Sequence, residues 1–505
     1  MSGTPAAIPR PCRVVVVGAG VCGLAAAHRV LERARELHLH PAELELTLLE
    51  ASDRVGGIVG TRRHDGYLVE HGPDNFITNK PWALDLARRL GLADQVQHIQ
   101  QDHRRALILC KGRLRTIPEG FQLMAPTRAW PVISTPILSP LAKLRLALER
   151  FIPAGREPDE SLASFATRRF GREAFERLIQ PLVGGIYAAD PAALSMAAAL
   201  PQFLEMERAP GHVTGALRRQ ARQRAATAPR SSSDTGVRYS LFATFHAGMG
   251  ALPEALARAL GPSLRLRAPV DSIAPAPPES DAGRWRVRLR SGEACPADWL
   301  VLATPARVSA ELLKGVAPAA AAGLTSIPLG SAAVVYLAYP RDRVLHPLDA
   351  AGFVVPHVEG RSILAATFCS SKYAGRAPAG KVLLRAFVGG ALQGHLLERS
   401  DDELAALAQG ELTPLLGLQG PPDWTFVSRY PDAMPQYTLG HLARTRSIHD
   451  AMKPLAGLLL ATNALDGVGI PDCVRSGEIA GDRVALSPHQ TAPTGGDRHA
   501  NPRHR

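Results

Sequence analysis

The first eighty residues alternate between apolar runs and one long stretch with helical spacing. Arg13 to Val17 is a β-branched run that predicts a buried strand, and Leu44 to Leu49 predicts a second strand. Between these two runs, Val21 to Leu39 carries apolar residues at helical intervals. This order of strand, helix and strand predicts the start of a parallel α/β sheet.

The middle of the chain changes to a mainly helical pattern. An apolar stretch, Phe121 to Pro140, lies within it and is interrupted by four prolines. Pro210 to Tyr239 is rich in Arg, Ala, Ser and Gly, which predicts a mobile loop around Ser231–Ser233. Helices are predicted at Trp82 to Leu90, Leu141 to Phe151, Leu162 to Phe170 and Ala174 to Leu182.

Strand-like runs return in the second half of the chain. The last of them, Gly457 to Thr462, leads into a glycine turn and a helix from Pro471, which repeats the pattern of the N-terminus. The residues after Leu486 are polar and predict a disordered tail. The other predicted strands are Leu264 to Ile273, Trp285 to Leu289, Trp299 to Ala303 and Ala332 to Tyr339.

The turn after the first predicted strand carries the pattern GxGxxG, formed by Gly18, Gly20 and Gly23. The first glycine permits a tight turn, the second lets the backbone approach a pyrophosphate, and the third lets the helix pack on the strand. Amide groups at the helix N-terminus then face the phosphates. Glu50 ends the second strand, where its carboxylate accepts hydrogen bonds from ribose hydroxyls and repels a 2′-phosphate. These residues predict a dinucleotide site.

Three further motifs resemble the two-dinucleotide-binding flavoproteins, such as the amine oxidases. Glu50 to Gly57 adds an R-x-G-G step, which carries donors along the diphosphate in that superfamily, and Tyr67 to Phe76 is similar to the loop that runs past the flavin ring. Gly467 to Gly469 opens a helix whose N-terminus can stabilise negative charge on a reduced flavin. The resemblance implies FAD. The contacts it implies, besides the GxGxxG glycines and Glu50, are Ala51, Arg54, Gly57, Gly72, Pro73, Asp74, Val270, Tyr430, Gly467, Val468 and Gly469.

More specific motifs resemble the bacterial protoporphyrinogen/coproporphyrinogen oxidases. Ile179 to Pro191 reads IQPLVGGIYAADP and looks like the signature of that family, and so do Met434 to Tyr437 (MPQY) and Gly467 to Cys473 (GVGIPDC). The likeness runs from about Arg13 to Asp482. It implies an α/β fold with a discontinuous Rossmann-like FAD-binding domain of the flavin amine-oxidase type, a mixed α+β substrate domain and a helical domain that meets the membrane.

The resemblance also implies boundaries for these domains. The FAD-binding domain would take residues 1–90, 211–304 and 429–486. The helical domain, a candidate for membrane association, would take residues 91–210, and the substrate domain residues 305–428. Residues 487–505 would form the tail.

Members of the resembled family oxidise a porphyrinogen, the reduced macrocycle, to the porphyrin in heme biosynthesis. Six electrons leave in three two-electron steps through FAD, and molecular oxygen becomes hydrogen peroxide. Gly185 matches a position where backbone lies close to the macrocycle, and Phe368 one that packs against a pyrrole ring, although core packing explains both equally well. No catalytic acid or base stands out, and His71, His441 and Asp190 are candidates for helping a proton leave as well as for structural roles.

The anchor for a substrate propionate stays open. Mitochondrial-type members carry an arginine where this sequence has Ala106, so Arg105 would replace it only after a shift of one residue. Lys111 and Arg113 follow the same predicted strand, but residues alternate faces along a strand and cannot all meet one ligand. We expect turnover of both protoporphyrinogen and coproporphyrinogen, with a slight preference for protoporphyrinogen.

The formal net charge of +12 admits three partners: nucleic acid, an anionic membrane surface or an acidic substrate. Nucleic acid is the weakest, because no zinc-finger spacing or RNA-binding aromatic signature accompanies the arginines. The six scattered cysteines predict neither a disulfide framework nor a metal site, which favours a cytoplasmic protein. Local charge and apolarity make Pro210 to Tyr239 and Phe121 to Pro140 the candidate surfaces for peripheral contact at the inner face of the membrane, with a solvated loop and a core segment as the alternatives. Assembly as a homodimer stays open.

Two other readings compete with the porphyrinogen oxidases. A phytoene-desaturase-like enzyme or an amine oxidase would share the N-terminal motifs, but not the IQPLVGGIYAADP and MPQY runs. A cofactor-free binding protein of the same fold, similar to the Rab-escort proteins, is disfavoured because both glycine turns and Glu50 are intact.

Overall fold

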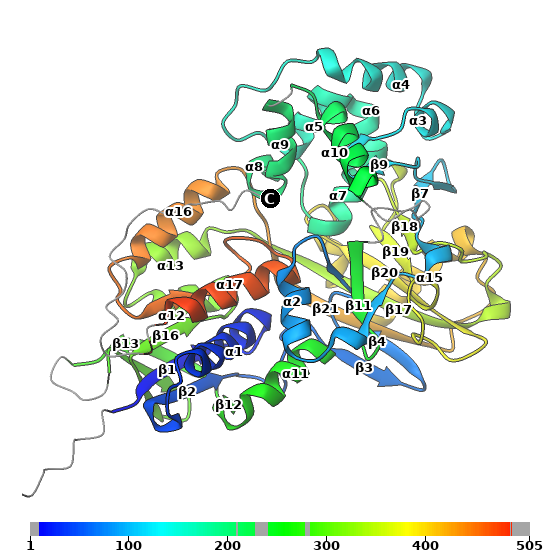
Figure 1. Ribbon diagram of the computed structural model, residues 1–505. Coiled ribbons are helices and arrows are strands. Elements are labelled where there is room, and N and C mark those ends of the chain that lie inside the picture. The colour runs from blue at the N-terminus through cyan, green and yellow to red at the C-terminus, as the bar shows by residue number, and fades with distance from the viewer. Residues whose placement is uncertain (1–9, 209–210, 228–240, 278–282, 485, 487–505) are drawn as a thin grey trace, which may run out of the picture.

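The computed structural model describes residues 10–208, 211–227, 241–277, 283–484 and 486. Two β-sheets lie side by side, and a group of helices lies above them in Figure 1. We call this group the helical unit. The predicted tail, residues 487–505, and the predicted loop centre Ser231–Ser233 lie outside the described residues.

The first sheet is parallel, and its strands come from the beginning, middle and end of the chain. Val17 at the end of β1 lies beside Leu49 of β2 and Leu302 of β16, so the carboxyl ends of the strands meet at one edge. This arrangement confirms the predicted discontinuous Rossmann-like domain. In spatial order the strands are β12 (Leu264–Arg265), β2 (Leu44–Leu49), β1 (Cys12–Val17), β16 (Trp299–Leu302) and β22 (Leu458–Leu460).

Both faces of this sheet are buried, which explains the unbroken valine run of β1. Val14 and Val16 face one apolar cluster, and Val15 and Val17 face another. Around the first cluster lie α1 (Val21–Glu36), α2 (Trp82–Arg89), α11 (Ala251–Leu260) and α17 (Ile470–Arg483). Around the second lie α12 (Ala306–Leu313), α13 (Pro318–Thr325), α16 (His441–Met452) and a small antiparallel sheet of β13 (Val270–Pro275), β14 (Trp285–Leu289) and β15 (Ala294–Ala297).

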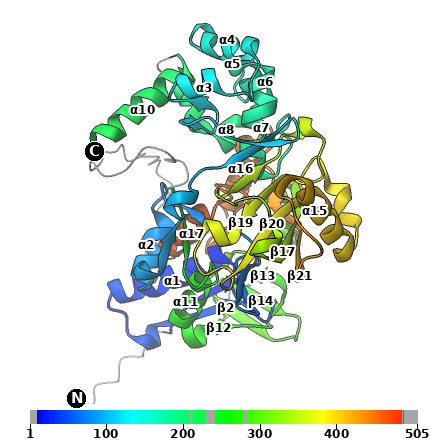
Figure 2. The ribbon, with the colours of Figure 1, turned by 90° about the vertical axis from the view of Figure 1, so that its right-hand side faces the viewer.

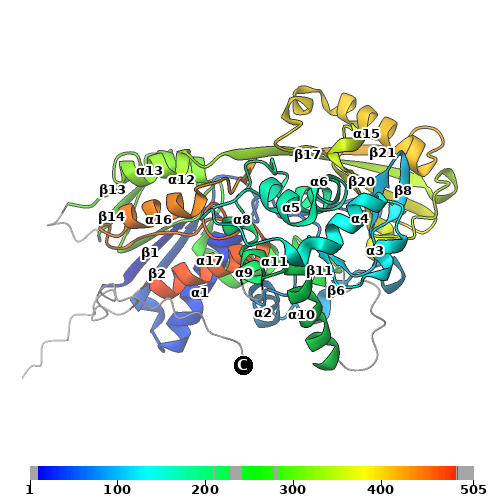
Figure 3. The same ribbon diagram turned by 90° about the horizontal axis from the view of Figure 1, so that it is seen from above.

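The second sheet is mostly antiparallel and has seven strands. One face packs on α15 (Asp401–Leu416), which Figure 2 shows on the outer side, and α14 (Cys369–Lys372) follows β19. Figure 3 shows the long strands β17 and β21 running from the side of α13 toward α15. In spatial order the strands are β21 (Trp424–Pro435), β17 (Leu329–Pro340), β20 (Lys381–Gly389), β19 (Ala365–Phe368), β18 (Gly352–Val354), β7 (Leu107–Cys110) and β8 (Arg113–Thr116).

This sheet does not respect the boundaries predicted from the sequence. Strands β7 and β8 come from residues 91–210, which were assigned to the helical domain, and β21 continues across the predicted boundary at residue 428. The reason is hydrogen bonding, because β7 pairs in parallel with β18 and so joins a sheet whose other strands come much later in the chain. The predicted strand Leu264 to Ile273 is likewise two strands, β12 and β13, in different sheets.

Short strands complete the connection between the two sheets. A hairpin of β3 (Thr61–His64) and β4 (Tyr67–Glu70) follows β2 in the chain. The short strand β11 (Phe242–Phe245) pairs with β5 (Phe76–Ile77) on one side and with β6 (Val96–His98) on the other.

The helical unit has its own apolar core, which includes Phe165, Phe170 and Met196. The predicted helix Leu162 to Phe170 is confirmed, whereas the next one is an α, π and α succession that continues to Tyr187. The expected loop Pro210 to Tyr239 is wrong where the structure describes it, because Val213–Thr227 is a helix. The unit contains β9 (Phe121–Gln122), β10 (Ala125–Pro126), α3 (Trp130–Ser134), α4 (Pro140–Ala147), α5 (Leu162–Phe170), α6 (Arg172–Ala174), α7 (Gln180–Tyr187), α8 (Met196–Ala199), α9 (Pro201–Arg208) and α10 (Val213–Thr227).

Candidate functional site

The glycine turn between β1 and α1 is built as the motif predicts. Gly18 has a φ of 99°, and a Cβ there would lie 2.8 Å from the carbonyl oxygen of Ala303. A Cβ at Gly23 would lie 1.8 Å from the carbonyl oxygen of Gly18, so both positions require glycine. At Gly20, in contrast, a Cβ would meet no atom within 4 Å. The space in front of Gly20 is therefore open toward the N-terminus of α1, where a phosphate group binds well.

Glu50 lies beside this turn at the end of β2. Its carboxylate accepts hydrogen bonds from the amide nitrogens of Ala19 (2.7 Å) and Ser52 (2.9 Å). The carbonyl of Glu50 accepts a hydrogen bond from the amide of Ala268, which brings the segment before Val270 to the same place. Ala51, the next residue, is exposed. The carboxylate is thus fixed at the edge of the glycine turn, as a ribose ligand requires.

The R-x-G-G step lies against the glycine turn. Gly20 and Gly56 form a parallel bridge, and a Cβ on Gly57 (φ 60°) would lie 3.6 Å from the Cα of Gly20. Arg54 donates from its guanidinium to the carbonyl oxygens of Val55 and Gly57. The two glycine-rich segments therefore form one surface of backbone donors.

The C-terminal glycine turn is held by a tyrosine of the MPQY run. The hydroxyl of Tyr437 donates to the carbonyl oxygen of Asn463 (2.7 Å) and accepts from the amide of Gly467 (2.6 Å). Its ring stacks on His441, whose Nε2 lies 3.1 Å from the carbonyl oxygen of Leu465. Burial raises the pKa of Tyr437, so the hydroxyl stays protonated. MPQY and GVGIPDC are therefore parts of one structural unit at the start of α17.

The loop after β4 joins the two sheets. Gly72 packs so closely on the R-x-G-G segment that a Cβ would lie 2.1 Å from the carbonyl oxygen of Ile58. Its own carbonyl accepts a hydrogen bond from Arg385 on β20. Pro73 and Asp74 follow and are partly buried, and Ser428 on β21 donates to the carbonyl of His71. The loop is thus fixed from both sides.

Asp74 lies in a buried ionic contact that the sequence motifs did not reveal. Lys372 Nζ is 2.8 Å from one carboxylate oxygen, and Arg385 Nη1 is 3.5 Å from the other. Burial by itself raises the pKa of Asp74, but Lys372 and Arg385 more than reverse this effect and hold the pKa at about 2. Asp74 is therefore ionised at any physiological pH.

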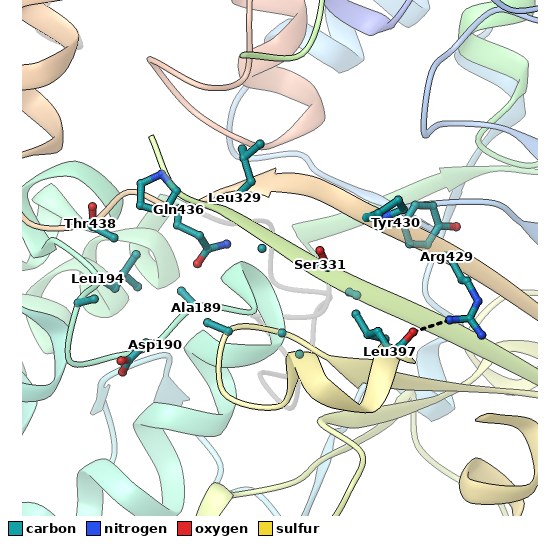
Figure 4. A pocket seen from close by; sticks show the side chains of 18 of the residues that line it. Ala189, Asp190, Leu194, Leu329, Ser331, Leu397, Arg429, Tyr430, Gln436 and Thr438 are labelled. Atoms are coloured by element: carbon teal, nitrogen blue, oxygen red, sulfur yellow. Dashed lines mark hydrogen bonds between the residues drawn. The ribbon is translucent and has the colours of Figure 1, made fainter. Parts of the chain in front are cut away.

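A cavity of about 570 Å³ opens where β17, β21 and the segment after α7 meet. Figure 4 shows Asp190, Ser331 and Tyr430 around it, from these three parts of the chain, with Arg429 hydrogen-bonded to the carbonyl of Leu397 at one end. Tyr430 is one of the predicted cofactor contacts and Asp190 a proton-transfer candidate, and the fold brings both to one cavity.

Gly185 lies on α7 where the helix faces the seven-stranded sheet. It is exposed, and a Cβ there would lie 3.9 Å from a methyl group of Val354 on β18. Open backbone at this point is compatible with the predicted approach to a macrocycle.

The other two predicted substrate contacts have protein partners in the structure. Phe368 is fully buried in the core beneath α15, with its ring centroid 6.1 Å from that of Phe353 and 5.6 Å from that of His346. Side chains alternate along β19, so Thr367 and not Phe368 faces the helical unit and the first domain. Arg105 forms an ion pair with Asp349 and also donates to its carbonyl. Phe368 thus packs in the core, as the sequence also allowed, because side chains alternate along a strand and this one faces α15. The substrate role of Arg105 stays a prediction.

The three proton-transfer candidates differ in their surroundings. His441 is fully buried and bonded to backbone, which supports a structural role. Burial and nearby Arg54 lower the pKa of His71, so its imidazole is neutral. Asp190 accepts a hydrogen bond from the amide of Ala192 (2.8 Å) and lines the cavity. Asp190 and His71 remain candidates.

Comparisons with known proteins agree on one family. The model for flavin-containing amine oxidoreductases matches residues 21–485. The chain is 37% identical to the coproporphyrinogen III oxidase of Propionibacterium freudenreichii over 99% of this chain and 96% of that one. It is 30% identical to the chloroplastic protoporphyrinogen oxidase of Nicotiana tabacum, over 93% and 84% of the two chains. The chain belongs to the flavin-containing amine oxidoreductases, and within them to the porphyrinogen oxidases.

A solved structure supports the same assignment. The crystal structure of a putative protoporphyrinogen oxidase from Exiguobacterium sp. 255-15 superposes with a TM-score of 0.79 and 31% identity, and the match covers 93% of this chain and 98% of that one. The cofactor is FAD, and the residues present fit it: an open phosphate position at Gly20, a fixed carboxylate at Glu50 and two helix N-termini, those of α1 and α17. These relatives favour a porphyrinogen oxidase over the cofactor-free binding protein, the desaturase and the amine oxidase.

Proposed function

We propose that this protein oxidises a porphyrinogen to the porphyrin in heme biosynthesis, with molecular oxygen as the final acceptor. The observation that carries the proposal is the likeness to porphyrinogen oxidases over nearly the whole chain, together with the single unit that the MPQY and GVGIPDC runs form at the start of α17. Overall, one porphyrinogen and three molecules of O₂ give one porphyrin and three molecules of H₂O₂.

The chain's contribution to this chemistry is position and electrostatics. When bound, FAD would supply the acceptor for two electrons and a hydrogen from a bridging carbon of the macrocycle in each of three rounds. The carboxylate of Asp190 and the phenol of Tyr430 both line the cavity. Tyr430 is linked to the predicted flavin loop, because Ser428 hydrogen-bonds to its hydroxyl and donates to the carbonyl of His71. Asp190 is suited to accept the proton that leaves a pyrrole nitrogen. The apolar walls, such as Leu194 and Leu329, suit a flat apolar ring.

We propose coproporphyrinogen III as the preferred substrate, in place of the slight preference for protoporphyrinogen that the sequence suggested. The support is the higher identity to the coproporphyrinogen III oxidase of Propionibacterium freudenreichii (37%) than to the plant protoporphyrinogen oxidase (30%). The four propionates of coproporphyrinogen need more cations or a wetter cleft than two propionates do.

The test is to incubate the purified holoenzyme with each porphyrinogen and to follow porphyrin fluorescence and peroxide. We expect turnover of both, kcat/KM in favour of coproporphyrinogen, and one peroxide for each two electrons removed. A preference for protoporphyrinogen contradicts the substrate assignment, and no porphyrin from either contradicts the function. The Asp190→Asn variant should lower kcat with little change in KM. Asp402→Asn, at an exposed position in the first turn of α15, is the control that should change neither.

The proposed function includes docking of the helical unit on an anionic membrane surface, from which a poorly soluble macrocycle would enter. The support is an apolar patch on α3, α4 and the following 3₁₀ turn, in which Trp130 is 74% exposed, Leu141 80% and Phe151 65%. Arg150 lies over the ring of Phe151 at 4.5 Å, so a cation borders the patch. None of the helices in the described ranges is long and apolar enough to cross a bilayer.

Vesicle binding tests this docking. Wild-type protein should bind phosphatidylserine-containing vesicles, lose that binding in high salt, and lose it in Leu141→Glu and Phe151→Glu. Leu345→Glu is the matched control, because Leu345 is 69% exposed and lies beside the C-terminal end of α15, outside the helical unit. Equal binding to neutral and anionic vesicles contradicts the electrostatic part. A fall in molecular mass in the two patch variants instead identifies the patch as the interface of a homodimer.

A further inference from the structure

Five charged side chains meet in the interior where the loop after β4 touches the seven-stranded sheet. We call them the ion cluster: Glu70, Asp74, Lys372, Arg376 and Arg385. All five are nearly excluded from solvent, with side-chain exposures of 4, 16, 10, 3 and 3% in that order. The cluster holds three cations and two carboxylates, so it carries at least one uncompensated positive charge.

The two carboxylates hold different parts of the cluster together. Asp74 contacts Lys372 and Arg385, and Glu70 lies 3.6 Å from Arg376. Glu70 also accepts hydrogen bonds from the hydroxyl of Thr61 and the amide of Met249. Burial raises the pKa of Glu70 although Arg376 opposes the effect, and any proton that Glu70 holds adds to the excess of positive charge.

Arg385 is the least compensated member of the cluster. It stands on the interior strand β20, and its guanidinium lies 4.7 Å from the ring centroid of Phe387 and 5.5 Å from that of Tyr336. One terminal nitrogen donates to the carbonyl of Gly72, while Nε has no hydrogen-bond partner among the described residues. A buried cation without full pairing costs several kcal/mol, and an apolar residue of similar size would avoid that cost.

The uncompensated charge lies directly behind the loop that the resemblance assigns to the flavin ring. Arg385 contacts the carbonyl of Gly72, and Lys372 and Arg385 both contact Asp74. Of the three loop residues predicted to touch the cofactor, Gly72 therefore binds the cluster and Asp74 belongs to it. Charges in a site closed to water act more strongly than charges at the surface, because little solvent screens them.

We propose that the ion cluster raises the reduction potential of the bound FAD, because its excess positive charge stabilises the negative charge that the flavin gains on reduction. The inference rests on the proposed place of the flavin beside Gly72–Asp74. It makes Lys372 and Arg385 positioning residues that act through the electrostatic potential and not by contact with substrate. A more positive potential favours removal of hydrogen from the porphyrinogen.

Midpoint potentials of the full-length holoenzyme, measured spectroscopically against a reference dye, test the sign of this effect. Lys372→Met and Arg385→Met should lower the potential, and Asp74→Asn should raise it. Arg385→Lys keeps the charge and should stay near the wild type. Each single change should alter the equilibrium between oxidised and reduced flavin on the order of tenfold, the effect of a unit charge roughly 10 Å away at an effective dielectric constant of about 20.

Two further variants separate electrostatics from structure. The double variant with Lys372→Met and Asp74→Asn removes one charge of each sign and should return the potential toward the wild type. Glu149→Gln breaks a comparably buried pair with Arg169 in the helical unit and should leave the potential unchanged. If Arg385→Met does not fold, Lys372→Met and Asp74→Asn still give the two opposite signs.

Shifts in the same direction for Lys372→Met and Asp74→Asn would overturn the proposal, as would unchanged potentials in both. Loss of bound FAD with an unchanged potential in the remaining holoenzyme would also overturn it and leave the cluster a purely structural one. The predicted opposite shifts in a protein that oxidises neither porphyrinogen would uphold this inference and contradict the proposed function.

Discussion

The two large sheets, of five and seven strands, place their polar groups in opposite ways. The five-stranded sheet is apolar on both faces, as the buried run Val14–Val17 shows, and its chemistry lies in backbone amides at one edge. The seven-stranded sheet carries a charged side chain, Arg385, on an interior strand, and this side chain holds a loop from the other domain. A site built from backbone amides needs glycines at fixed spacing and can therefore be recognised as a sequence motif. A site built from side chains of distant segments has no such motif.

The largest effects that test this comparison are expected from substitutions within the GxGxxG motif. Gly23→Val should destabilise the fold by about 3 kcal/mol or more, because a Cβ would lie 1.8 Å from the carbonyl oxygen of Gly18. Gly20→Val should fold but purify largely without flavin, because only the open phosphate position is filled. Flavin absorbance per protein and thermal unfolding measure both. Full flavin occupancy in Gly20→Val contradicts the phosphate assignment.

In the seven-stranded sheet, the largest effect of a substitution should be on stability and not on substrate binding. Phe368→Ala removes a fully buried ring and should cost about 3–5 kcal/mol of unfolding free energy, with KM for either porphyrinogen unchanged. Denaturant unfolding and steady-state kinetics at low temperature give the two readouts. A raised KM without a stability loss would return Phe368 to the substrate site.

The next largest effect is expected for a substitution of Glu50 in the first domain. Glu50→Ala should weaken FAD binding by roughly 1–3 kcal/mol, the value of a charge-assisted hydrogen bond. Isothermal titration of the apoprotein with FAD measures it. Glu45→Ala, at an exposed position on β2, is the control. Equal affinities in the two variants would mean that Glu50 only caps the turn at Ala19.

Tyr437 tests the link between the two C-terminal motifs. Tyr437→Phe keeps the stack on His441 but removes the hydroxyl from the Gly467 amide, and it should weaken FAD binding by about 1–2 kcal/mol. The same titration measures this change. An unaltered affinity would show that the turn at Gly467 holds its shape without the hydroxyl.

The smallest effect is expected at Arg105. Arg105→Ala should change stability by no more than about 1 kcal/mol and leave KM unchanged for both substrates, because its ion pair with Asp349 is roughly half exposed. A KM increase confined to coproporphyrinogen would instead make Arg105 a propionate contact after rearrangement.

Much of the cofactor domain was predictable, because its rules are local. The GxGxxG turn, the strand that ends on Glu50 and the final strand–turn–helix are each contained in a short stretch of sequence, and the fold places them as predicted. The ion cluster left only a faint signal, an arginine in the otherwise apolar run Val382–Gly389. Nothing local connects Arg385 with Asp74, which lies more than three hundred positions earlier in the chain.

The sequence by itself determined the family, the cofactor and the parallel sheet, because backbone turns, helix N-termini and buried valine runs are properties of neighbouring residues. Only the tertiary structure decided that β7 joins the second sheet, that Phe368 faces α15 and that Lys372 and Arg385 meet Asp74. These outcomes depend on strand pairing and on which face of a strand is buried. A shift of one residue reverses every face, and single residues near the substrate therefore could not be assigned from motifs alone.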